Sequence, residues 1–235
     1  MKSPLLFAAS LLFMTSLVAE PPTHIATTPV PRDGEAWWVE RHTKCVATTE
    51  AGGIDLAFLG DSITQGWEGQ PAWEKNFAPL KAANFGFSGD RTEHVLWRLT
   101  HGELVGLAPK VIVIMIGTNN VGHNSSNPQQ TADGVKAIVS TLRSKIPEAK
   151  ILLLAIFPRD EKADGPLRQQ VAEASSLFKE VADGTHVHYL DLASTFLNED
   201  GTAPKDVMPD FLHLSEKGYD IWAGAITPKI MELMK

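Results

Sequence analysis

The chain has 235 residues, 43% of them hydrophobic, and its 21 basic against 28 acidic residues give a formal net charge of −7. This length suits one globular domain with a sizeable core. The acidic balance and scattered basic residues argue against a surface that binds nucleic-acid phosphates. A single cysteine, Cys45, excludes an internal disulfide framework and a multi-cysteine metal site.

Residues 1–19 predict a secretory signal peptide, with Lys2 as the positive charge, an apolar stretch, and the small Ala19 before the cut. The apolar stretch has about 15 residues, fewer than the roughly 20 that a spanning helix needs. We therefore expect cleavage after Ala19, a secreted or periplasmic location and no stable membrane insertion afterwards. An uncleaved N-terminal anchor is the alternative. Residues 20–36 predict a linker, followed by one domain over 37–235.

Short apolar runs then alternate with longer amphipathic segments along the chain. The predicted strands are residues 54–59, 82–85, 111–116, 151–156 and 187–190, and the predicted helices are 91–100, 131–146, 166–182 and 215–233. Two of the runs are apolar on both faces, which is typical of a parallel sheet covered by helices on each side. We predict a doubly wound α/β domain, a three-layer sandwich around a five-stranded parallel sheet. In such a sheet the chemistry lies beyond the carboxyl ends of the strands.

Three of these strand ends carry glycine followed by small polar residues. They read Gly60-Asp61-Ser62, Gly86-Phe87-Ser88-Gly89 and Gly117-Thr118-Asn119. Glycine permits a sharp turn, and a helix that starts directly afterwards points free N–H groups at negative charge. Ser62 is placed to expose its hydroxyl as a nucleophile, while simple helix capping by this serine stays open.

A serine nucleophile needs a base, and the base needs a group that orients it. His213 lies just before the last predicted helix, and therefore at the same edge of the sheet as Ser62. Asp210 precedes it by three residues and can accept the ring N–H, which leaves the other ring nitrogen free to take the serine proton. A turn or cap role for Asp210 is the alternative.

The ordered blocks Gly60-Asp61-Ser62, Gly89, Gly117-Thr118-Asn119 and Asp210-x-x-His213 resemble the SGNH (GDSL-type) hydrolase family. The stretch 84–99 is similar to the catalytic subunits of the intracellular platelet-activating factor acetylhydrolases, and the resemblance covers residues 54–233. It implies a flavodoxin-like fold. Ser88 and Asn120 depart from what relatives often carry, at positions without a catalytic role.

The resemblance implies roles for five residues. Ser62 would be the nucleophile, His213 the general base and then acid, and Asp210 its orienting carboxylate. The oxyanion hole would consist of the amides of Ser62 and Gly89 and the side chain of Asn119. Beside these, we hypothesise that three apolar residues near the nucleophile and the base line the substrate cleft and leave room for a short acyl chain: Ile63, Leu212 and Trp67.

These residues predict a serine esterase that removes short, acetyl-type acyl groups from a small ester, without a cofactor or metal. The alternatives are a lysophospholipase or thioesterase of the same fold, a deacetylase of acetylated carbohydrate, and a non-catalytic carbohydrate-binding module. His186 and His188 share a strand face near Asp191, but nothing completes a zinc motif. The sequence does not indicate the alcohol portion of the substrate or the oligomeric state.

Overall fold

The computed structural model describes residues 23–235, so the predicted signal peptide and the start of the predicted linker lie outside the described residues. Five strands form one parallel sheet in the order β2-β1-β3-β4-β5. Their bounds are β1 Leu56–Gly60, β2 Ala82–Gly86, β3 Val111–Met115, β4 Lys150–Leu154 and β5 Val187–Leu190. The predicted five-stranded parallel sheet is confirmed, and each strand boundary lies within two residues of the predicted one.

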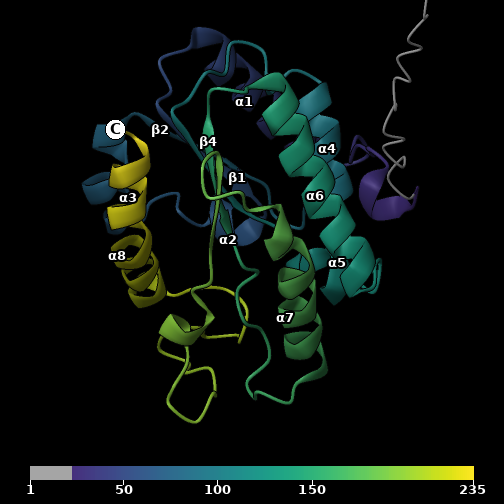
Figure 1. The fold of residues 1–235 in the computed structure, drawn as a ribbon, viewed down its shortest axis with the longest axis vertical. Helices are drawn as coiled ribbons and strands as arrows, with labels where there is room; N and C mark the ends of the chain where they lie inside the picture. Colours follow the sequence, from purple (N-terminus) through teal and green to yellow (C-terminus); the bar gives the residue numbers. More distant parts are fainter. Residues whose placement is uncertain (1–22) are drawn as a thin grey trace, which may run out of the picture.

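Helices cover both faces of this sheet, as Figure 1 shows. The α-helices are α1 Ala36–Ala51, α2 Ser62–Gln65, α3 Pro71–Asn76, α4 Thr92–Thr100, α5 Thr118–Gly122, α6 Pro128–Lys145, α7 Pro166–Phe178 and α8 Glu216–Leu233. The 3₁₀ helices are η1 Ile25–Thr27, η2 Ala78–Leu80, η3 Lys179–Val181 and η4 Ala193–Phe196. Helices α3 and α8 lie on one side of the sheet, and α4, α6 and α7 lie on the other (Figure 1). Within residues 23–235, no helix is both long and apolar enough to cross a membrane.

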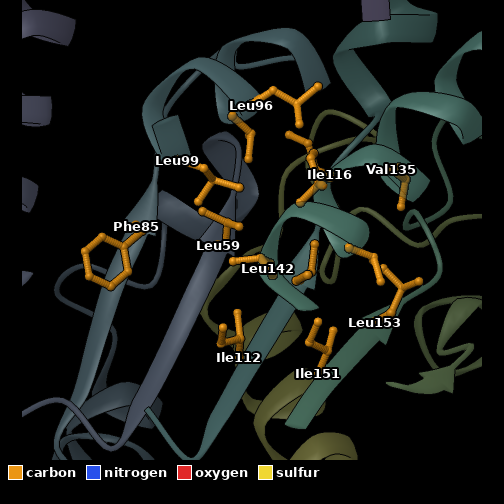
Figure 2. Packing of buried hydrophobic residues seen from close by; sticks show 14 of the residues in the cluster. Leu59, Phe85, Leu96, Leu99, Ile112, Ile116, Val135, Leu142, Ile151 and Leu153 are labelled. Carbon is orange, nitrogen blue, oxygen red and sulfur yellow. The ribbon is translucent and has the colours of Figure 1, made fainter. Parts of the chain in front are cut away.

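Alternation along the strands divides the core into two clusters. On β1, Ala57 and Leu59 point to the cluster beneath α4 and α6, whereas Leu56 and Phe58 point to the cluster beneath α3 and α8. Figure 2 shows the first cluster, where leucine and isoleucine side chains of the strands meet those of α4 and α6. Each large apolar side chain buried in this way contributes about 1.5–3 kcal/mol. The sheet is therefore held rigidly from both sides.

The segment ahead of the sheet differs from the predicted linker. Residues 24–35, which we call the N-terminal strap, pack on the domain instead of hanging free. Thr92 donates its hydroxyl to Ala26 O at 2.9 Å, and Val30 N donates to Glu93 O at 3.2 Å. Gly134 on α6 makes room for the strap, because a Cβ there would lie 2.6 Å from Ala26 O. Helix α1 then follows directly from the strap.

Candidate active site

The nucleophile candidate stands at the carboxyl end of β1, between β2 and β3 in the sheet. From β1 the chain runs first to β2 on one side and later to β3 on the other, and in open α/β sheets such a reversal is where a crevice forms at the carboxyl ends of the strands. Helix α2 begins at Ser62, and the carboxylate of Asp61 caps it by accepting Ile63 N–H at 3.0 Å. Capping is therefore performed by Asp61, and the hydroxyl of Ser62 is available for another partner.

That partner is His213. The Oγ of Ser62 lies 3.0 Å from Nε2 of His213, and Nδ1 of the same ring lies 2.7 Å from Oδ2 of Asp210. The three side chains thus form a continuous hydrogen-bonded line. Residues 151 positions apart in the sequence meet here because β1 and the loop before α8 end at the same edge of the sheet.

The loop that carries Asp210 and His213 is shaped by its own hydrogen bonds. The Oδ1 atom of Asp210 accepts Leu212 N–H at 3.1 Å and His213 N–H at 2.7 Å. Phe211, which follows Asp210 directly, has a left-handed φ of 59°. Burial disfavours the charged form of Asp210, but hydrogen bonds from the ring and backbone of His213 outweigh it and lower the pKa of this carboxyl below its usual value. Asp210 is therefore a carboxylate at neutral pH.

Hydrogen bonds join the segment of Gly89 to α2 and the side chain of Asn119 to the segment of Gly89. Ser88 N donates to Oε1 of Gln65 at 2.7 Å, and Nδ2 of Asn119 donates to Asp90 O at 3.0 Å. Gly89, with φ 74°, lies between these two bonds. Within residues 23–235 the amides of Ser62 and Gly89 and the second N–H of Asn119 donate to no protein group. These three donors come from the ends of the neighbouring strands β1, β2 and β3.

A comparison with known protein families identifies the family of this chain. A model of the GDSL-like lipase/acylhydrolase family matches residues 58–221. The chain belongs to this family. The matched stretch contains Ser62, Gly89, Asn119, Asp210 and His213, so the resemblance predicted from the sequence blocks is confirmed at family level.

Individual relatives and solved structures are similar to this chain as well. The chain is 38% identical over 203 residues to the human platelet-activating factor acetylhydrolase IB subunit alpha2, covering 86% of this chain and 87% of that protein. A GDSL-like lipase from Bacteroides thetaiotaomicron superposes with a TM-score of 0.68 at 19% identity, covering 81% and 97% of the two chains. An acetylxylan esterase from Geobacillus stearothermophilus superposes with a TM-score of 0.62 at 21% identity, covering 76% and 94%. The protein is a hydrolase of the GDSL esterase type, and the two solved structures share its fold.

Two of the three predicted cleft residues lie elsewhere. Trp67 is fully buried in an aromatic cluster with Phe58 and Trp222, so it does not line a substrate cleft. Ile63 is also buried, with 1% of its surface exposed, because the turn into α2 directs its side chain into the core. Leu212 alone is partly exposed, next to His213. The hypothesis that Ile63 and Trp67 contact substrate is wrong for this reason.

Sequence reasoning missed two arginines beside the predicted oxyanion donors. Arg32, on the strap, donates to Ser88 O at 2.6 Å. Arg159, in the loop after β4, donates to Thr118 O at 2.8 Å, one residue before Asn119. Arg159 could have been found from the sequence, because it follows the end of a predicted strand, where site residues of this kind of sheet lie. No comparable signal marks Arg32, because it stands in a segment without apolar periodicity.

Other titratable side chains near the crevice have structural partners. Burial lowers the pKa of His94 to about 3, assisted by the nearby charge of Arg91, and Nδ1 of this neutral ring accepts Arg91 N–H at 3.0 Å. Over residues 23–235, no three His, Cys, Asp or Glu side chains are grouped so that they could hold a metal ion. His186 and His188 accordingly lie outside any such group.

Proposed function

We propose that the protein is a serine esterase that hydrolyses short-chain, acetyl-type carboxylic esters through an acyl-enzyme. The observation that carries the proposal is the hydrogen-bonded line from Asp210 through His213 to Ser62. A hydroxyl becomes a nucleophile when a positioned base takes its proton and a third group fixes the base. All three functions are available in this line.

In the first half-reaction Asp210 accepts the Nδ1–H of His213, which leaves Nε2 as the proton acceptor 3.0 Å from the Ser62 hydroxyl. Ser62 Oγ attacks the ester carbonyl carbon, and its proton moves to His213 Nε2. The imidazolium then gives this proton to the alcohol oxygen as the carbon–oxygen bond of the ester breaks. The acyl group remains on Ser62.

The tetrahedral intermediate carries a negative oxygen, which needs hydrogen-bond donors. The free amides of Ser62 and Gly89 and the second N–H of Asn119 are the groups proposed for this role. One such donor typically contributes about 3–4 kcal/mol to the transition state. In the second half-reaction His213 takes a proton from water, the hydroxide attacks the acyl carbon, and Ser62 recovers its proton as the acid leaves.

The preference for a short acyl group rests on two supports. The human relative at 38% identity is named an acetylhydrolase. In addition, Leu212 is partly exposed and adjoins His213 in the sequence, and we propose that its bulky apolar side chain borders the acyl site. A long acyl chain would have to pass this side chain.

Substitution of the nucleophile tests the mechanism. Ser62→Ala removes Oγ, so we expect hydrolysis of 4-nitrophenyl acetate and covalent labelling by a fluorophosphonate to fall to background. Removal of a nucleophile of this kind lowers kcat by about 10⁶-fold. Ser88→Ala is the matched control, because its hydroxyl is exposed and lies outside the triad. Labelling of the Ser62→Ala protein at wild-type level would contradict the assignment.

A substrate series tests the finer proposal with the same wild-type enzyme. We expect kcat/KM to fall from nitrophenyl acetate to the octanoate, and a preference for octanoate would favour the lysophospholipase or thioesterase alternative. Acetylated phospholipids and acetylated xylo-oligosaccharides then distinguish the two classes of alcohol. Preferential deacetylation of the oligosaccharide would favour the carbohydrate deacetylase.

A further inference from the structure

The N-terminal strap reaches the proposed oxyanion hole, although it lies outside the stretch 58–221 that the family model matches. Its last part crosses the loop between β2 and α4. There the guanidinium of Arg32 donates from Nη1 to Ser88 O at 2.6 Å and to Oδ1 of Asp90 at 3.0 Å. These two residues flank Gly89 on either side.

The guanidinium also lies directly over the glycine. A Cβ on Gly89 would lie 3.3 Å from both Nη1 and Nη2 of Arg32. Glu35 holds the far side of the group, accepting from Nε at 2.9 Å and from Nη2 at 2.8 Å. Only 15% of the Arg32 side chain is exposed. The guanidinium is therefore fixed by carboxylates on two sides while it binds the loop.

The bond to Ser88 O has a geometric consequence for the next amide. Ser88 C=O and Gly89 N–H belong to one planar, trans peptide group, in which they point in opposite directions. Fixing the carbonyl from outside therefore fixes the direction of the N–H. Without this restraint the peptide can rotate as a unit, because Gly89 tolerates both left- and right-handed φ values.

We propose that Arg32 is a positioning residue that holds the Ser88–Gly89 peptide so that Gly89 N–H points into the oxyanion hole. The proposal rests on the esterase function proposed above. A charged donor on the carbonyl also polarises the peptide, which makes its N–H a stronger donor. The strap is therefore part of the catalytic unit.

Kinetics of Arg32→Gln and Arg32→Lys test the proposal. Displacement of a preorganised group by about 1 Å costs on the order of 10²-fold in rate, so we expect kcat on nitrophenyl acetate to fall about 10- to 100-fold for Arg32→Gln. KM should stay within about threefold, because the ground-state ester makes no oxyanion. Arg32→Lys keeps the charge without the planar fork and should lie between these values.

Arg143→Gln is the matched control. Arg143 also donates to backbone carbonyls, of Pro147 and Ala149, but these precede β4 and so lie at the opposite edge of the sheet. Its kcat should equal that of the wild type. In a second measurement on Arg32→Ala, free guanidinium at concentrations far below denaturation should restore part of kcat, whereas it should not affect Ser62→Ala.

The outcomes separate the two proposals. An Arg32→Gln protein that melts like Arg143→Gln but keeps kcat within twofold of the wild type would overturn the positioning role. A loss that appears only in KM, or that guanidinium does not relieve, would also overturn it. A wild-type protein without esterase activity would instead contradict the proposed function.

Discussion

Asp61 stands next to the nucleophile and is fully buried. One carboxylate oxygen caps α2, while within residues 23–235 the other has no hydrogen-bond partner. Burial raises the pKa of Asp61 to about 7, although the charge of Arg159 acts in the opposite direction. An unfolded chain ionises the same group near pH 4. This carboxyl therefore links the stability of the turn that carries Ser62 to pH.

The sign of this linkage gives a prediction for Asp61→Asn. Between pH 4 and pH 7 the folded wild type keeps a proton that the unfolded chain loses, so its free energy of unfolding falls as pH rises through this window. The amide keeps the cap acceptor but does not titrate. We expect the variant to gain stability relative to the wild type by up to about 4 kcal/mol between pH 4 and pH 8, as measured by urea unfolding. The exposed Asp164→Asn is the control, and a pH-independent difference for Asp61→Asn would contradict the raised pKa.

Helix α4 anchors the loop that carries Gly89 through buried charges. Arg98, on its inner face, donates from Nε to Oδ2 of Asp90 at 2.9 Å and pairs through Nη1 with Glu103. None of the Arg98 side chain is exposed. Asp90 in turn accepts from Nε1 of Trp38 on α1 at 2.8 Å. The helix, the loop and α1 thus share one buried carboxylate.

Breaking this pair should destabilise the whole domain. Arg98→Met keeps most of the apolar stem but leaves Glu103 buried without a cation and leaves Asp90 with Arg32 as its remaining ion-pair partner. Removal of one partner from a buried ion pair costs about 3–5 kcal/mol, which we expect as the loss in free energy of unfolding. Arg143→Met, at the end of α6, should change it by less than about 0.5 kcal/mol. A loss below about 1 kcal/mol for Arg98→Met would show that the two carboxyls are neutral in the fold.

The elements that could be predicted are those with strong apolar periodicity. The strand of residues 111–116 is apolar throughout and was found where expected, and the predicted helix of residues 131–146 begins only three residues late. Helix α1 was missed because its buried residues are only Trp38, Cys45 and Thr49. These positions are too few and too far apart to give a recognisable helical pattern of apolar residues. The strap was missed because it is held by hydrogen bonds and by Arg32, and a linker-like composition does not reveal such partners.

At the scale of the molecule, the candidate site could be predicted because its residues follow strand ends, and parallel strands bring their carboxyl ends together. The direction in which individual side chains point could not be predicted. Trp67 follows Ser62 by five residues, yet the turn after α2 buries it among aromatic rings from β1 and α8. Which side of a turn faces solvent depends on packing between elements that are distant in the sequence. The residues of the turn alone therefore do not indicate which of its side chains are buried.

Packing of the whole molecule also decides the chemistry of its single thiol. Cys45 lies on α1 against the sheet with 7% of its surface exposed, and burial raises the pKa of its thiol to about 12. Thiolate is the reactive form, so at pH 8 its fraction is about 10³-fold lower than for an exposed cysteine. We expect the native protein to resist a disulfide reagent until urea unfolds it. Thr48→Cys in a Cys45→Ala background places a thiol on the exposed face of the same helix and should react at once. Equally fast reaction of native Cys45 would mean that α1 leaves the sheet without global unfolding.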